Sequence, residues 1–407
     1  MFYVKSIAPY LPRYMRRQCL STASSNCFPG TSMPFVPNVV FRDSKHDDVL
    51  PCFRIINEDG DVMDGATDPQ LSRALCTKIY SQMIRLKTMD NILYDAQRQG
   101  RISFYMTSFG EEAISFGSAS ALRLRDMVFA QYREPVTRTD MAKAVRCQYI
   151  MAPSSLTIRP FHRLWPRSFP RHHALLLLHG YARRSILTCT VPCVFGELLT
   201  FQAAGAAYAF KLAKEDRIAV CYFGEGAASE GDFHAALNIA STKDCPILFF
   251  VRNNGFAIST PTVEQFRGDG IASRGSGYGI PVMRVDGNDF LAVHEVTRRA
   301  REFILKENRP VLIEAMSYRQ GHHSTSDDST QYRAVAEIKH WKETCDPIDR
   351  TKRYLLASKY WMWTVRKNED VELIRSSCLD RNAGGLQRSR TDTCKIRNGP
   401  MYSLHYS

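Results

Sequence analysis

The first patterned stretch of the chain carries apolar residues at helical spacing. They recur at intervals of three to four positions, at Leu71, Leu75, Ile79, Met83, Leu86 and Ile92. This spacing gives one apolar helix face. Asp68-Pro69 suits the start of such a helix, with proline in its first turn, and Gly100 suits its end. A second predicted helix follows the Gly110-Glu111-Glu112 sequence.

Short apolar runs alternate with helical patterns in the second half of the chain. Runs bounded by glycine, proline or charged residues indicate buried strands, which in a parallel sheet are apolar on both faces. The predicted strands are 217–223, 246–251, 282–285 and 311–315, and the predicted helices are 203–212, 231–242 and 290–306. Strands that alternate with helices predict an α/β fold with a doubly wound parallel sheet.

Charge and cysteine content exclude some classes of function. The net charge of +13 alone would suggest a nucleic-acid partner, but the basic excess gathers in residues 138–184 and 366–397, without a recognition motif. We therefore expect no nucleic-acid binding. The twelve cysteines are scattered and favour reduced thiols inside a cell. No apolar run is long enough to predict a membrane span.

The N-terminal region is basic and free of acidic residues as far as Asp43. Arginines and a lysine precede several serines there, which predicts a mitochondrial transit peptide over residues 1–27. The alternative is a disordered basic N-terminus. Residues 28–69 are rich in proline, glycine and aspartate and predict an extended arm, ahead of an α/β domain over residues 70–361.

Two predicted strand ends carry unusual loops. Gly224-Glu225-Gly226 follows the first strand, and Arg252-Asn253-Asn254-Gly255-Phe256 follows the next. Ligands of such sheets bind at the carboxyl ends of strands. Magnesium prefers carboxylate, amide and carbonyl oxygens together with phosphate. The loops therefore predict a magnesium–diphosphate site, and the alternative is a pair of ordinary turns.

These loops and the sequence around them resemble a known protein family. The likeness covers residues 28–135 and 202–361. Its motifs are RISFYMTSFGEEA (101–113), FAQYRE (129–134), CYFGEGAASEGD (221–232), RNNGFAISTPT (252–262), RGDGIASRG (267–275) and YRQGHHSTSDDS (318–329). They resemble α subunits of thiamine-diphosphate-dependent branched-chain 2-oxoacid dehydrogenases. The resemblance implies a thiamine-diphosphate-binding fold.

The resemblance also implies a role for each matching residue at the cofactor. Magnesium would be bound by the side chains of Glu225 and Asn254 and by the carbonyl of Phe256. The diphosphate would be contacted by Tyr132, Arg133 and Arg252, and Gly224 and Gly226 would allow close approach of the backbone. His323 would lie beside the thiazolium ring and assist the reaction with the lipoyl acceptor.

The resemblance implies an oxidative decarboxylation in the mitochondrial matrix, with acyl transfer to lipoyl groups of an E2 core. A β subunit would complete an α2β2 heterotetramer and provide a glutamate to the aminopyrimidine ring. Ser324 matches a regulatory phosphorylation position, which implies a kinase and a phosphatase. The alternatives, from residue type alone, are that His322-His323 forms a solvent-exposed turn and that Ser324 is an ordinary loop serine.

Two segments depart from the family pattern, at 136–200 and at 362–407. The first lacks the expected diphosphate and potassium ligands and instead carries basic and aromatic residues with an orphan His172-His173 pair. The codons of residues 146–152, read two bases later, can encode the missing Met-Pro-Val-His-Tyr-Gly segment. We therefore interpret the first segment as a frameshift or a mis-spliced intron. K+ is expected of the family, but its ligands are missing here.

Two alternatives to this function stay open. A pyruvate-type α subunit shares the cofactor loops, although the run from His322 to Asp328 favours the branched-chain type. An inactive scaffold, or a mis-translated product, is the alternative from a different class, because the two aberrant segments remove expected ligands and part of the subunit interface.

Overall fold

The computed structural model describes residues 49–100, 105–131, 133–134, 189–190 and 196–360. The predicted transit peptide, Tyr132, most of the 136–200 segment and the 362–407 tail lie outside these residues. Among the helices described, none has the length and hydrophobicity of a membrane span.

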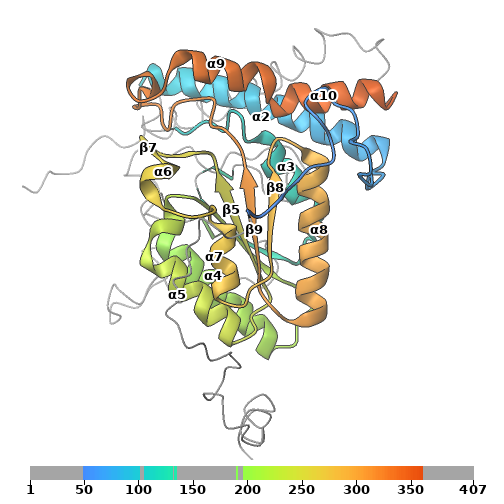
Figure 1. Ribbon diagram of the computed structural model, residues 1–407, viewed down its shortest axis with the longest axis vertical. Coiled ribbons are helices and arrows are strands. Elements are labelled where there is room, and N and C mark those ends of the chain that lie inside the picture. The colour runs from blue at the N-terminus through green and yellow to red at the C-terminus, as the bar shows by residue number, and fades with distance from the viewer. Residues whose placement is uncertain (1–48, 101–104, 132, 135–188, 191–195, 361–407) are drawn as a thin grey trace, which may run out of the picture. The chain divides into compact units, whose positions relative to one another are not determined.

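A seven-stranded parallel sheet forms the centre of the described structure (Figure 1). Its strand order is β1-β8-β9-β5-β4-β2-β3, and each neighbouring pair is parallel. The strands are β1 (Cys52–Phe53), β2 (Met127–Ala130), β3 (Cys189–Thr190), β4 (Ala219–Gly224), β5 (Ile247–Asn253), β8 (Val282–Asp286) and β9 (Val311–Met316). The α/β fold with a parallel sheet is therefore confirmed.

Helices cover both faces of this sheet. The described helices are α2 (Arg73–Arg98), α3 (Glu112–Ala121), α4 (Gly196–Leu212), α5 (Gly231–Thr242), α6 (Thr262–Gln265), α7 (Ala272–Gly277), α8 (Phe290–Glu307), α9 (Val335–Thr344) and α10 (Pro347–Ala357), with 3-10 turns η6 (Ala227–Ser229) and η7 (Ser329–Gln331). A small antiparallel ribbon joins β6 (Phe256–Ala257) to β7 (Thr260–Pro261).

The alternation of side chains along each strand divides the core in two. Val220 and Tyr222 of β4 pack with α2, α3, α8 and α10. Cys221 and Phe223 of the same strand pack with α4 and α5 on the other face. Figure 1 shows α8 on one side of the sheet and α4, α5 and α7 on the other. This is the doubly wound arrangement that the apolar runs predicted.

The start of α2 was predicted too early. Asp68 accepts a hydrogen bond from the Gln70 amide (2.7 Å), and Gln70 has a positive φ of 50°. This local turn places Pro69 ahead of the helix. Ser72 caps α2 instead, since its side chain accepts from the Leu75 amide at 3.3 Å. The helix ends close to the predicted position, before Gly100.

The described end of the predicted N-terminal arm joins the domain. Cys52 and Phe53 pair with Arg284 and Val285 at the edge of the sheet. The amides of Ile55 and Ile56 both donate to Asp289 at 2.7 Å. Residues 49–56 therefore belong to the sheet and its core rather than to a separate extension.

Candidate functional site

The ends of β4 and β5 bring the two predicted cofactor loops together. The strands are adjacent and parallel, and Gly224 is paired with Arg252 in the register. Glu225 and Asn254 therefore emerge side by side at one edge of the sheet. Gly226 explains part of this closeness, because a Cβ there would lie 2.9 Å from the Cβ of Ala257. At Gly224 a Cβ would meet only the Arg252 carbonyl, at 3.8 Å.

Glu225 is a buried carboxylate that lacks a full set of partners. It is 2% exposed, and its Oε1 has no hydrogen-bond partner among the described residues. Burial, together with the negative charge of Glu111, raises the pKa of Glu225 to about 7, while the Asn254 backbone amide acts in the opposite direction. A nearby cation would favour the ionised form of this carboxyl group.

The side-chain amide of Asn254 is held in one orientation. Its Nδ2 donates to Glu111 Oε1 at 2.6 Å, and its Oδ1 accepts from the Phe256 amide at 3.3 Å. The Phe256 carbonyl, in turn, accepts from Arg319 Nη1 at 3.2 Å. The amide oxygen of Asn254 therefore lies on the side of the Gly255–Phe256 turn.

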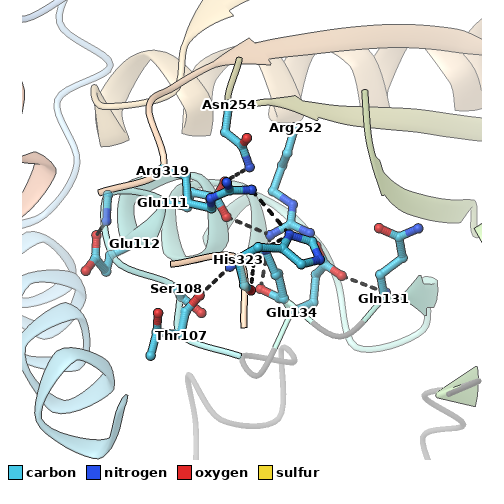
Figure 2. Close-up of polar contacts among 12 residues, drawn as sticks. Thr107, Ser108, Glu111, Glu112, Gln131, Glu134, Arg252, Asn254, Arg319 and His323 are labelled. Atoms are coloured by element: carbon cyan, nitrogen blue, oxygen red, sulfur yellow. Dashed lines mark hydrogen bonds and ion pairs between the residues drawn. The ribbon is translucent and has the colours of Figure 1, made fainter. Parts of the chain in front are cut away.

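Arg252 lies between two buried glutamates (Figure 2). Its Nη1 is 3.1 Å from Glu111 Oε2, and its Nη2 is 2.7 Å from Glu134 Oε1. Burial alone would raise the pKa of Glu111, but Arg252 and Arg133 hold it below its ordinary value. In this structure the predicted diphosphate ligand is thus an ion-pair partner of two carboxylates.

His323 is surrounded by positive charge. Its Nδ1 is 3.3 Å from Arg133 Nη2 and 3.2 Å from Arg319 Nη1. Burial, followed by the charges of these two arginines, lowers the pKa of His323 to about 3. The ring is therefore neutral near pH 7. Since guanidinium groups only donate, Nδ1 acts as the acceptor and the ring proton is on Nε2.

The loop that carries His323 is anchored by its backbone. Arg133 Nη2 donates to the His323 carbonyl at 2.7 Å, and the His323 amide donates to Asp327 Oδ2 at 2.7 Å. Ser324 is half-buried, and its hydroxyl is 3.1 Å from that of Ser326. The predicted phosphorylation position thus directly follows His323, whose ring contacts Arg133 and Arg319.

The described oxygen donors fit a magnesium ion better than a transition metal. Glu225 supplies one buried, unpaired carboxylate oxygen, and Asn254 and the Phe256 carbonyl supply neutral oxygens nearby. Within the described ranges, no group of three or more His, Cys, Asp or Glu side chains converges on one point. A donor set with a single carboxylate leaves coordination positions for phosphate and water, as magnesium requires.

Sequence reasoning missed three residues of this cluster. Glu111, Glu134 and Arg319 contact the predicted ligands but were not assigned a role. Glu111 and Glu134 are separated from Arg252 by more than a hundred positions, so local spacing gave no signal. Tyr132 lies outside the described residues, next to Arg133.

Comparison with known proteins identifies the family. Residues 80–380 match the family model described as "Dehydrogenase E1 component". The chain belongs to the dehydrogenase E1 component family. The resemblance seen in the sequence motifs is therefore confirmed.

The relatives within the E1 component family carry a more specific name. The chain is 45% identical over 357 residues to the human protein named "2-oxoisovalerate dehydrogenase subunit alpha, mitochondrial". The matched region covers 88% of this chain and 77% of the human protein. A protein of the same name from Dictyostelium discoideum is 48% identical over 79% of this chain and 69% of its own length. One from Caenorhabditis elegans is 45% identical over 87% and 78%.

Proposed function

We propose that this chain is the α subunit of a branched-chain 2-oxoacid dehydrogenase E1 component. It would take part in the oxidative decarboxylation of branched-chain 2-oxoacids, with acyl transfer to a lipoyl-bearing E2. Membership of the E1 component family and the names of the relatives support this proposal. The structural observation that carries it is the proximity of Glu225 and Asn254 just beyond the paired ends of β4 and β5, where a buried carboxylate oxygen lacks a partner among the described residues.

The proposed cofactor is thiamine diphosphate with Mg2+. Glu225, Asn254 and the Phe256 carbonyl would hold the metal, as the available oxygen donors suggest. Once bound, thiamine diphosphate supplies the electron sink that decarboxylation requires.

The proposed diphosphate ligands are Arg133, Arg252 and Tyr132. Arg252 would exchange one of its two carboxylate contacts for a phosphate oxygen, which guanidinium geometry suits. Gly224 and Gly226 add no side chain of their own to this edge of the sheet, so the backbone there would allow close approach of the diphosphate.

The proposed task of His323 follows from its neutral state and tautomer. Arg133 and Arg319 occupy Nδ1, so the neutral ring can donate a hydrogen bond only from Nε2. This would make His323 a hydrogen-bond donor to the reacting oxygen, and in this way it would assist the reaction with the lipoyl acceptor.

The proposed assembly is an α2β2 heterotetramer with a β subunit in the mitochondrial matrix, reached through a transit peptide at residues 1–27. A kinase and a phosphatase would act on Ser324. A phosphate there adds up to two negative charges one residue from His323 and three from Asp327. Repulsion from Asp327 and from a bound diphosphate would displace the loop.

The test is an activity assay of the chain produced together with its β subunit and supplied with lipoyl-bearing E2. We expect turnover of 3-methyl-2-oxobutanoate and much slower turnover of pyruvate. A preference for pyruvate would favour the pyruvate-type alternative. Failure of the assembled protein to bind thiamine diphosphate with Mg2+ would favour an inactive scaffold.

The 136–200 segment needs a separate test, because the expected diphosphate and K+ ligands are missing from it. Sequencing the transcript distinguishes a frameshift or splicing error from an intact message. An intact message for this segment would contradict our interpretation, and the chain would then be expected to show no K+ dependence.

A further inference from the structure

Glu111 is a buried carboxylate at the centre of the cofactor edge, without a role in the proposed chemistry. It precedes α3 directly, in the N-cap position, but its side chain makes no capping hydrogen bond. Instead, its two oxygens reach the neighbouring strand ends. Oε1 accepts from Asn254 Nδ2 at 2.6 Å, and Oε2 accepts from Arg252 Nη1 at 3.1 Å.

The contact with Asn254 selects which end of its side-chain amide faces Glu111. An ionised carboxylate only accepts hydrogen bonds, so it selects the NH2 end of the amide. The oxygen end is then turned away from Glu111, where the Phe256 amide donates to it. A metal ligand must present oxygen rather than nitrogen hydrogens, and residues behind the ligands commonly fix this orientation.

We propose that Glu111 is a positioning residue that orients the Asn254 amide oxygen toward the metal and at the same time holds Arg252 beside it. This inference rests on the proposed function, since it takes Asn254 as a magnesium ligand. It assigns Glu111 no contact with the substrate or with the reacting atoms.

The neighbouring Glu112 provides a matched control. It is equally buried, at 1% exposure, but its carboxylate accepts from the Gly110 amide at 3.0 Å. Figure 2 shows its side chain turned away from Arg252 and Asn254. Burial raises the pKa of Glu112 to about 8, so a neutral glutamine closely replaces the form present near pH 7.

The first experiment compares Mg2+ affinity in the assembled α–β protein at saturating thiamine diphosphate, by titration calorimetry. In Glu111→Gln, the introduced amide can satisfy Arg252 with its oxygen only by turning its NH2 group toward the NH2 group of Asn254. The Asn254 amide then either loses its partner at residue 111 or flips, and a flip would turn its nitrogen toward the metal and toward the Phe256 amide. We expect Mg2+ affinity to fall about 10- to 100-fold, as is typical when such a supporting contact is lost. Glu112→Gln should bind Mg2+ as the wild type does.

The second experiment is a reciprocal exchange that only a positioning role predicts. In the double variant Glu111→Gln/Asn254→Asp, the introduced amide donates to the introduced carboxylate and its oxygen still accepts from Arg252. The other oxygen of the aspartate faces the metal, and the net charge of the pair is unchanged. Asn254→Asp alone places two carboxylates against each other. We expect both single variants to bind Mg2+ more weakly than the double variant, by about 10-fold or more.

The outcomes separate the two hypotheses. Wild-type affinity in Glu111→Gln, or loss of affinity that the double variant does not recover, would overturn the positioning role while the proposed function stands. Absence of Mg2+-dependent binding in the wild-type assembly would overturn the proposed function and this inference with it. Thermal unfolding and size-exclusion profiles of each variant check that the fold and the assembly are intact.

Discussion

Two buried glutamates, on the strands that flank β5, differ in how many of their carboxylate oxygens accept hydrogen bonds. Glu314, in the middle of β9, is 0% exposed, and both of its oxygens accept hydrogen bonds. Its donors are Asn253 Nδ2, the amides of Ile271 and Ala272, and Nε and Nη2 of Arg284. Glu225, at the end of β4, is nearly as buried but has an oxygen without a partner in the described structure.

This difference distinguishes buried carboxylates that stabilise the fold from a buried carboxylate that can bind a ligand. A buried charge whose hydrogen bonds are complete stabilises one arrangement of the chain, because removal of any partner leaves a desolvated group. A buried carboxylate with an unused oxygen is costly unless something else binds it. Glu314 therefore belongs to the scaffold that holds Asn253 and its loop, whereas the unused oxygen of Glu225 supports its proposed role as a metal ligand.

The largest effect is expected from Glu225→Gln on catalysis. The substitution keeps the size of the side chain but removes the only carboxylate of the proposed metal site. We expect turnover to fall about 1000-fold or more, since a bound metal contributes several kcal/mol to such reactions. The cofactor-free fold should persist by circular dichroism. Near-wild-type turnover at saturating Mg2+ would contradict the assignment of Glu225 as a ligand.

Glu314→Ala, in contrast, should lower the stability of the fold rather than act directly on catalysis. It removes the acceptor of Arg284 Nε, of Asn253 Nδ2 and of the Ile271 and Ala272 amides, and leaves Arg284 only its contacts with Asp269 and Leu50. We expect the free energy of unfolding to fall by about 3–5 kcal/mol, measured by denaturant titration. Glu302→Ala on α8 is the control, because its ion pair with Arg298 is exposed and should contribute under about 1 kcal/mol. If the two substitutions lowered the free energy of unfolding equally, Glu314 would contribute no more to the scaffold than an exposed ion pair does.

The pH dependence of stability sharpens the comparison. The pKa of Glu225 is raised to about 7 by burial, so the cofactor-free fold favours the protonated form. The stability this group contributes is fully present below its unfolded pKa and is lost as the pH rises through about 7. Relative to Glu225→Gln, the wild type should lose up to about 3 kcal/mol between pH 4.5 and pH 8. A constant difference across this range, in parallel unfolding titrations, would show that the carboxylate is satisfied.

The smallest effect is expected from Gly226→Ala, which tests the packing between the two cofactor loops. The added Cβ would lie 2.9 Å from that of Ala257, so one loop must shift. We expect a loss of about 1–3 kcal/mol in the free energy of unfolding, as for other overpacked sites. Gly231→Ala is the control. A Cβ there meets no described atom within 4 Å, and at the start of α5 alanine should be neutral or slightly stabilising. A loss as large in the control would mean that loop packing is not the cause.

The strands and helices were predictable where burial alone determines them. Helix α5 spans the predicted 231–242 range, and the apolar runs of β4, β5, β8 and β9 lie within one or two residues of their predictions. Strand β5 continues through Arg252 and Asn253, beyond the apolar run. Polar residues can extend a buried strand when distant partners satisfy them, and those partners cannot be read from local pattern.

The site was predictable only in part, for the same reason. The glycine-bounded loops predicted that Glu225 and Asn254 would meet, because adjacent parallel strands end at one edge. The glutamates that hold Arg252 come from the segments before α3 and after β2, and Glu111 is 141 positions away from Arg252. Short strand β2, with four residues of ordinary apolar character, gave no distinct signal of its own.

Strand β5 is the fourth of seven in the sheet, with β4 and β9 hydrogen-bonded along its two edges. Backbone amides in such a central strand exchange with solvent mainly when the whole domain opens. The proposed metal ligands at its end should therefore keep their geometry until global unfolding. Substitutions that lower the thermal stability of the domain should then also weaken retention of the cofactor, and stabilising substitutions should strengthen it.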